Sequence, residues 1–148
     1  MERLDAIRNM LRVSERIVSS GQPTATQLAD IAAAGFDAVI NLAMPDSDGA
    51  FADEAARVEA LGLRYVSIPV PYDAPARHHL EAFFAAMNAL AGRHVWVHCA
   101  LNWRVSAFLY LYHRRVLGVP PGAARRAMWP DWIPDATWQD FLDRHEPR

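Results

Sequence analysis

Residues 94–106 read HVWVHCALNWRVS and are the most informative part of the sequence. The first five, 94–98, are rich in β-branched and aromatic residues, which predicts a short strand. From Arg104 to Leu117 the apolar residues recur at helical spacing, which predicts a largely buried helix. Between these two elements lies a tight loop that begins with the thiol of Cys99 and ends with the guanidinium of Arg104.

The chemistry of this loop suits an anion. Successive backbone N–H groups converge in such a turn, and the following helix adds the positive end of its dipole. The same field, together with the guanidinium of Arg104, favours the thiolate of Cys99 over the thiol. The sequence therefore predicts a site that binds a phosphoryl group and attacks it. Cys99 is also the only cysteine of the chain, so the competing interpretation is a small buried core thiol.

Strands and helices alternate along the chain. The expected strands are residues 16–20, 36–42, 63–70 and 94–98, and the expected helices are residues 24–34, 50–61, 76–91 and 104–117, a short one from Pro120 and a last one over 135–144. This alternation is typical of βαβ units around a mostly parallel sheet. We therefore expect an α/β fold in which residues 1–148 form one domain, with helices flanking the central sheet. Ligands in such folds bind beyond the carboxyl ends of the strands, where Cys99 lies.

Composition narrows the functional classes. The 148 residues are 52% hydrophobic and 22% charged, as in a globular domain, and the formal net charge is -2. A chain without overall positive charge is not expected to bind nucleic acid or an anionic membrane. The N-terminal residues lack the apolar core of a signal peptide and no apolar run could span a bilayer, so we expect a cytoplasmic protein. No cluster of histidine, cysteine and acidic residues has metal-ligand spacing.

The loop and its surroundings resemble a known enzyme family. Residues 98–106 are similar to the signature loop of protein-tyrosine and dual-specificity phosphatases, which reads His-Cys, five residues, Arg, then Ser or Thr. Residues 68–73 (IPVPYD), followed by an amphipathic helix, resemble the loop that supplies the general acid in dual-specificity enzymes. Residues 20–23 (SGQP) and 35–42 (GFDAVINL) resemble the opening of small bacterial members. The resemblance extends over residues 16–117 and implies the phosphatase fold.

The resemblance also implies a mechanism. Cys99 would attack phosphorus in line, Arg104 would hold the equatorial oxygens, and Asp73 would protonate the departing oxygen. Water would then hydrolyse the phosphocysteine, and the family resemblance implies neither a metal nor another cofactor. The remaining loop residues would bind the substrate: His98, Ala100, Leu101, Asn102, Trp103, Val105 and Ser106. Among them, His98 would tune the thiolate by hydrogen bonding, and the Ser106 hydroxyl would help it leave. The expected partner is a phosphorylated protein or small molecule.

One departure from the family pattern leaves the role of the arginine open. Four residues, rather than five, separate Cys99 from Arg104. Either the loop is one residue tighter and Arg104 binds phosphate, or the alignment has no gap. In the second alternative Val105 takes the arginine position, and Asn102 replaces a loop glycine, which its tolerance of left-handed backbone angles allows.

Alternatives also remain for the acid and for the function. If Asp73 only caps the helix that follows Pro75, the candidate acids are Asp131 and Asp135. The altered spacing suits a phosphate or phosphoprotein binder without turnover. It also suits a rhodanese-like sulfurtransferase, whose cysteine loop is shorter, although such a carrier needs no arginine at position 104.

Overall fold

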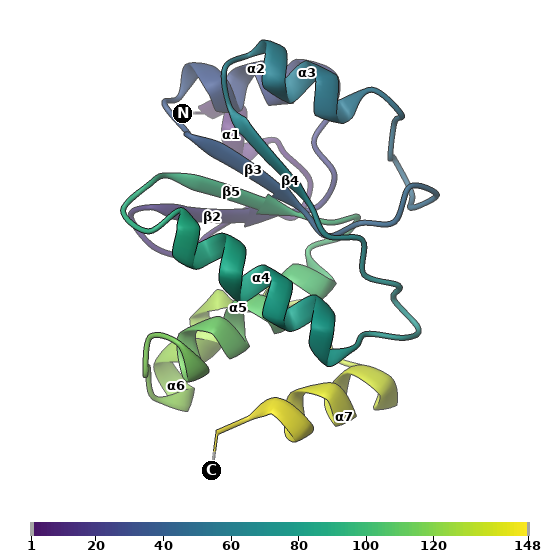
Figure 1. The fold of residues 1–148 in the computed structure, drawn as a ribbon, viewed down its shortest axis with the longest axis vertical. Helices are drawn as coiled ribbons and strands as arrows, with labels where there is room; N and C mark the ends of the chain where they lie inside the picture. Colours follow the sequence, from purple (N-terminus) through teal and green to yellow (C-terminus); the bar gives the residue numbers. More distant parts are fainter. Residues whose placement is uncertain (1, 148) are drawn as a thin grey trace.

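The computed structural model describes residues 2–147 and shows a five-stranded sheet with helices on both faces (Figure 1). The sheet has the order β1-β2-β5-β3-β4, and its neighbouring strands are parallel except for β1 and β2. The strands are β1 Leu11–Arg12, β2 Ile17–Ser20, β3 Ala38–Asn41, β4 Arg64–Ser67 and β5 Val95–His98. The expected α/β fold with a mostly parallel sheet is confirmed. The edge strand β1, which is antiparallel, lies outside the expected strands.

Helices cover the two faces of the sheet unequally. Helices α1 to α3 lie on one face, and α4 to α7 lie on the other (Figure 1). Their bounds are α1 Glu2–Asp5, α2 Ala25–Ala33, α3 Glu54–Ala60, α4 Arg77–Ala89, α5 Trp103–Arg115, α6 Pro121–Ala124 and α7 Ala136–His145, and a 3-10 turn, η1 Arg125–Ala127, follows α6. No helix within residues 2–147 is long and apolar enough to cross a membrane.

The inner strands β2, β3 and β5 are buried on both faces because their alternate side chains enter different cores, whereas the edge strands β1 and β4 are partly exposed. Val18, Val39 and Trp96 belong to the core under α1 to α3. The neighbouring residues Ile40 and Val97 belong to the larger core under α4 to α7. A parallel sheet covered in this way exposes its strand ends rather than its faces, so a binding site is expected at an end.

Helix α2 begins where the sequence predicts. The Thr24 hydroxyl accepts from the Gln27 N–H at 3.2 Å, and the Gln27 side chain accepts from the Thr24 N–H at 3.0 Å. This reciprocal capping box satisfies two N–H groups that the helix leaves unpaired. Beyond the helix, Gly35 has φ of 93°, which residues other than glycine rarely adopt.

Most predicted elements are somewhat shorter in the structure, and two of them are shortened by four or more residues. The helix expected over residues 50–61 begins at Glu54, because most of residues 45–53 form turns. The strand expected over 63–70 ends at Ser67, since the prolines at positions 69 and 71 have no N–H to donate to a sheet.

The parallel register brings four chain segments together at one edge. Ser20 pairs with His98, His98 pairs with Asn41, and Asn41 pairs with Ser67, so the last residues of four strands lie in one row. The loops that leave β2, β3, β4 and β5 therefore begin side by side. This edge holds the predicted loop that starts at Cys99.

Candidate active site

The loop after β5 changes direction at Asn102. This residue has φ of 67° and ψ of 16°, in the left-handed region, and α5 begins at the next residue. Asparagine tolerates these angles better than most residues do, which allows the chain to turn from strand to helix within a few residues. Cys99, at the start of the loop, is only 1% exposed and belongs to the core under α4 to α7.

Residues near the N-terminus hold the loop backbone from outside. The Asn9 side chain donates to the Leu101 carbonyl at 2.9 Å, and the Gln22 N–H donates to the Ala100 carbonyl at 3.0 Å. In return, the Asn102 side chain donates to the Asn9 carbonyl at 2.9 Å and to the Ser19 hydroxyl at 3.0 Å. Nothing in the sequence pattern marked Asn9, because its contact depends on the tertiary fold.

These bonds orient the amide groups of the loop. In a trans peptide the carbonyl and the following N–H point in opposite directions, so the outward carbonyl of Ala100 turns the N–H of Leu101 inward. Outside the helices and strands of residues 2–147, no backbone-to-backbone hydrogen bond is donated by the N–H of Ala100, Leu101, Trp103 or Arg104. A loop with this arrangement can accept an anion.

Arg104 is buried at the same edge of the sheet. Its side chain donates to the Val70 carbonyl at 2.8 Å and to the Ser47 hydroxyl at 3.4 Å. The residue is 6% exposed, yet no carboxylate within residues 2–147 forms a salt bridge with it. Burying a cation without an anionic partner is costly, so this site favours a bound anion.

The three candidate acids occupy different settings. Asp73 is exposed in the turn after β4, and the residue that caps α4 is Ala76, so Asp73 has no capping role there. Asp135 caps α7 by accepting from the Trp138 N–H at 3.0 Å. Asp131 is exposed in a turn before that helix.

Helix α7 is tied to the loop that carries Asp73. The Trp138 indole N–H donates to the Tyr72 carbonyl at 2.7 Å. The Tyr72 ring lies 5.8 Å from that of Trp103, measured between ring centres, and 6.0 Å from the Arg104 guanidinium carbon. Burial raises the pKa of Tyr72, and the negative charge of Asp135 adds to that effect. The C-terminal segment therefore holds Tyr72, whose ring forms a wall of the candidate site beside Arg104.

The remaining predicted loop residues have mainly internal contacts. The Ser106 hydroxyl donates to the Asn102 carbonyl and accepts from the Trp129 N–H at 2.8 Å, and no hydrogen bond joins it to Cys99 within the described residues. Val105 is fully buried in the core. The role expected for Ser106 in releasing the thiolate stays a prediction; in the structure its hydroxyl connects Asn102 to Trp129.

His98 has a buried partner that the sequence did not indicate. Its Nε2 lies 2.7 Å from a carboxylate oxygen of Glu54, and its Nδ1 lies 3.2 Å from the Cys99 carbonyl oxygen. Burial would raise the pKa of Glu54, but the hydrogen bond and charge of His98, with donors from Gln22 and Tyr65, hold it below its ordinary value. An acidic residue in the first turn of a helix is already explained by the helix dipole, so the sequence alone does not mark Glu54 as a site residue.

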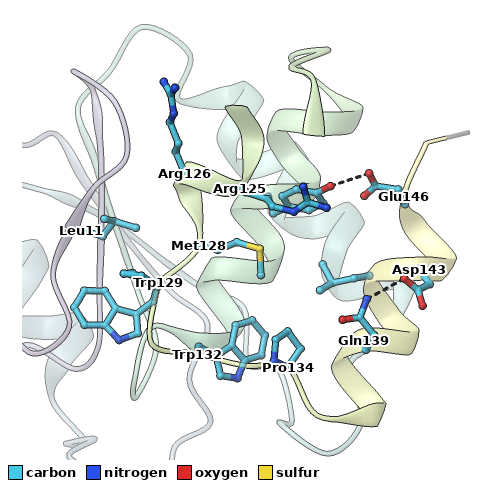
Figure 2. A pocket seen from close by; sticks show the side chains of 13 residues that line it. Leu11, Arg125, Arg126, Met128, Trp129, Trp132, Pro134, Gln139, Asp143 and Glu146 are labelled. Atoms are coloured by element: carbon cyan, nitrogen blue, oxygen red, sulfur yellow. Dashed lines mark hydrogen bonds between the residues drawn. The ribbon is translucent and has the colours of Figure 1, made fainter. Parts of the chain in front are cut away.

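A cavity of about 740 Å³ lies beside α7 (Figure 2). Trp129 and Trp132 line one side of it, and Gln139 and Asp143 of α7, with Glu146 just after that helix, line the other. Neither Cys99 nor Arg104 lines this cavity. It touches the candidate site only indirectly, because Trp132 stacks on Trp103 with ring centres 6.4 Å apart.

Comparison with known proteins identifies the family. Residues 9–111 match the family described as "Beta-lactamase hydrolase-like protein, phosphatase-like domain". The chain belongs to this family. Its match spans the loop around Cys99 and the strands on either side of it, so the resemblance to protein-tyrosine phosphatases seen in the sequence is confirmed at the family level. No curated protein matches the sequence.

Solved structures support the same assignment. A protein from Shewanella putrefaciens CN-32 described as "Putative phosphatase (DUF442)" is 36% identical, with a TM-score of 0.87 over 97% of this chain and 95% of that one. Tk-PTP in its active form is 20% identical, with a TM-score of 0.79 over 95% and 97% of the two chains. TpbA from P. aeruginosa in complex with pTyr is 21% identical, with a TM-score of 0.64 over 81% and 71%. The last two similarities establish the fold, which is that of the protein-tyrosine phosphatases.

Gly21→Ala tests whether the segment after β2 shapes the loop. A Cβ at this position would lie 2.5 Å from the Ala100 carbonyl oxygen, so backbone atoms would have to move. We expect the free energy of unfolding in urea to fall by roughly 1–3 kcal/mol, as in other overpacked sites. We also expect weaker phosphate binding by calorimetry.

Gly122→Ala is the matched control, because a Cβ there meets no atom within 4 Å. It should leave both stability and phosphate binding close to those of the wild type. Equal behaviour of the two variants would show that the close contact between Gly21 and Ala100 does not shape the loop.

Proposed function

We propose that the chain hydrolyses phosphomonoesters through a phosphocysteine formed on Cys99. The observation that supports this most strongly is the buried guanidinium of Arg104, which has no carboxylate partner among the described residues. It lies at the sheet edge where the loop after β5 presents unpaired amides and α5 directs the positive end of its dipole. A dianionic phosphoryl group would satisfy all three features.

The proposed reaction has two steps. The Cys99 thiolate attacks phosphorus, the S–P bond forms, and the bond from phosphorus to the leaving oxygen breaks while Asp73 gives that oxygen a proton. Water then attacks the phosphocysteine, the S–P bond breaks, and the proton from water passes to the Asp73 carboxylate. Arg104 and the loop amides hold the equatorial oxygens in both steps.

Asp73 is the proposed acid because of its position. It follows Tyr72, whose ring lies beside Arg104, and its side chain makes no capping bond to α4. Asp135 is occupied as the cap of α7. The side chains of Asp73 and Asp131 are both without a hydrogen bond or ion pair among the described residues, and Asp73 is preferred because it follows Tyr72, whose ring lies beside Arg104.

An aryl phosphate is the proposed type of substrate. The rings of Tyr72 and Trp103 lie 5.8 Å apart beside Arg104 and would offer an aromatic surface to a phosphotyrosine-like leaving group. TpbA, which shares the fold, was crystallised with pTyr. Either a phosphorylated protein or a small molecule could supply such a group.

A phosphate binder without turnover is the second candidate. Its support is the spacing of four residues between Cys99 and Arg104, together with the low exposure of Cys99. Phosphate binding without hydrolysis would favour it. No contact in the described residues favours a sulfurtransferase, and assays of thiosulfate:cyanide transfer beside aryl-phosphate hydrolysis separate that activity from the proposed one.

Cys99→Ser should abolish hydrolysis of p-nitrophenyl phosphate while leaving phosphate binding and the circular dichroism spectrum intact. At neutral pH a hydroxyl is a far weaker nucleophile than a thiolate. In the wild type, iodoacetate should alkylate Cys99, and phosphate should protect it. Turnover by Cys99→Ser near the wild-type rate would remove the covalent mechanism.

Asp73→Asn should slow hydrolysis of poor leaving groups more than that of p-nitrophenyl phosphate, since a good leaving group needs little protonation. The variant should also lose the alkaline limb of the pH profile, where the acid deprotonates. Asp131→Asn is the control, because it removes an exposed aspartate from a nearby turn. If Asp131→Asn or Asp135→Asn instead slowed poor leaving groups selectively, that aspartate would be the general acid.

Arg104→Lys should lower kcat/KM by roughly 10²- to 10³-fold, comparable to the loss of one preorganised donor in a transition state. Lysine keeps the charge but cannot donate two parallel hydrogen bonds to phosphate oxygens. Arg126→Lys, at an exposed position in η1, is the control and should change little. A kcat/KM nearly unchanged in Arg104→Lys would favour the alignment without a gap and the interpretation as a phosphate binder without turnover.

A further inference from the structure

We infer that Glu54 is a positioning residue that keeps the His98 ring doubly protonated beside Cys99 and so favours the thiolate. The inference rests on the proposed function only in taking Cys99 as the nucleophile. It concerns the pair formed by Glu54 and His98. His98 belongs to the loop pattern of the sequence, whereas Glu54 lies outside it.

The pair is enclosed by the sheet edge and α3. Glu54 is 4% exposed and His98 is fully buried, and 2.7 Å separates Glu54 Oε2 from His98 Nε2. The other carboxylate oxygen of Glu54 accepts from the Gln22 side chain, also at 2.7 Å. A buried carboxylate with these partners has a fixed direction, so it fixes the orientation of the imidazole ring as well.

Tyr65 of β4 also lies near Glu54, and each influences the pKa of the other. The Tyr65 hydroxyl accepts from the Asn41 side chain at 3.0 Å. Burial, with the charge of Glu54, raises the pKa of Tyr65 to about 12, so this hydroxyl remains neutral. The titratable groups that face the ring are thus Glu54 from α3, Tyr65 from β4 and Cys99 from the loop, and Arg104 carries the next charge at this edge.

The hydrogen-bond partners decide where the protons lie. His98 Nδ1 faces the Cys99 carbonyl, which can only accept, so Nδ1 carries a hydrogen. His98 Nε2 faces a carboxylate that already receives a hydrogen bond from Gln22 and whose pKa lies below its ordinary value. Glu54 is therefore ionised and Nε2 also carries a hydrogen. The ring is an imidazolium paired with a carboxylate.

This pair acts on Cys99 in two ways. The positive ring lies next to the residue that carries the thiol, and a nearby positive charge favours thiolate over thiol. The Nδ1–H also donates to the Cys99 carbonyl and fixes the first peptide of the loop. If Glu54 were neutral, a buried ring would lose its second proton, because burial disfavours an unpaired charge.

Nitrogen-15 NMR of the histidine rings, with His98 assigned by its absence in His98→Asn, tests the proton positions. In the wild type at pH 7 we expect both ring nitrogens of His98 to be protonated, and in Glu54→Gln we expect one of them to lose its proton. Glu59→Gln removes an exposed charge from the same helix and should leave the His98 signals unchanged. A bare ring nitrogen in wild-type His98 would overturn the inference, even if Glu54→Gln failed to fold.

The rate of Cys99 alkylation by neutral iodoacetamide tests the consequence without any substrate. In folded Glu54→Gln at pH 6.5 we expect alkylation about tenfold slower than in the wild type, because the ring, which is the member of the pair in contact with Cys99, becomes neutral. Glu59→Gln should react at the wild-type rate. Equal rates for Glu54→Gln and wild type would overturn the inference while leaving the proposed hydrolysis intact.

A wild type that binds phosphate and shows the charged ring but does not hydrolyse aryl phosphates would instead refute the proposed function alone.

Discussion

Asn102 sets the geometry on which the site depends. Its left-handed backbone lets the chain leave β5 and enter α5 with only four residues between Cys99 and Arg104. Its side chain then ties the loop to Asn9 and Ser19, which belong to the N-terminal part of the chain. One residue therefore provides both the turn and its anchor. A loop of this length is kept open toward an anion by contacts from outside, rather than by its own internal bonds.

The charges at this edge are arranged in two layers. Glu54 and His98 form a buried neutral pair behind Cys99, supported by side chains from β3, β4 and the segment after β2. In front of it, Arg104 is held by the loops after β3 and β4 and has no carboxylate partner among the described residues. The charges of Glu54 and His98 cancel, whereas the charge of Arg104 does not. The positive potential is therefore highest near Arg104, where a phosphoryl group would bind.

Local patterns predicted the elements, and long-range contacts decided the details of the site. The capping box at Thr24 and the alternation of strands and helices are encoded within a few residues, so the sheet and the position of Cys99 could be predicted. The bond from Asn102 to Asn9 joins residues 93 positions apart, and that from His98 to Glu54 joins residues 44 apart. Neither leaves a periodic signal in the sequence. For the same reason the sequence left open whether Asp73 caps α4. In the structure Ala76 occupies the N-cap position, so Asp73 does not cap this helix.

The central claim is that Cys99 carries the phosphoryl group during turnover. Rapid acid quenching of Asp73→Asn with p-nitrophenyl phosphate, followed by mass spectrometry of the peptide that contains Cys99, measures this directly. The good leaving group keeps the first step fast while the second step is slowed, so the intermediate accumulates. We predict a phosphoryl group on Cys99 that is absent from Cys99→Ser treated in the same way. Unmodified Cys99 during measurable hydrolysis would contradict the account.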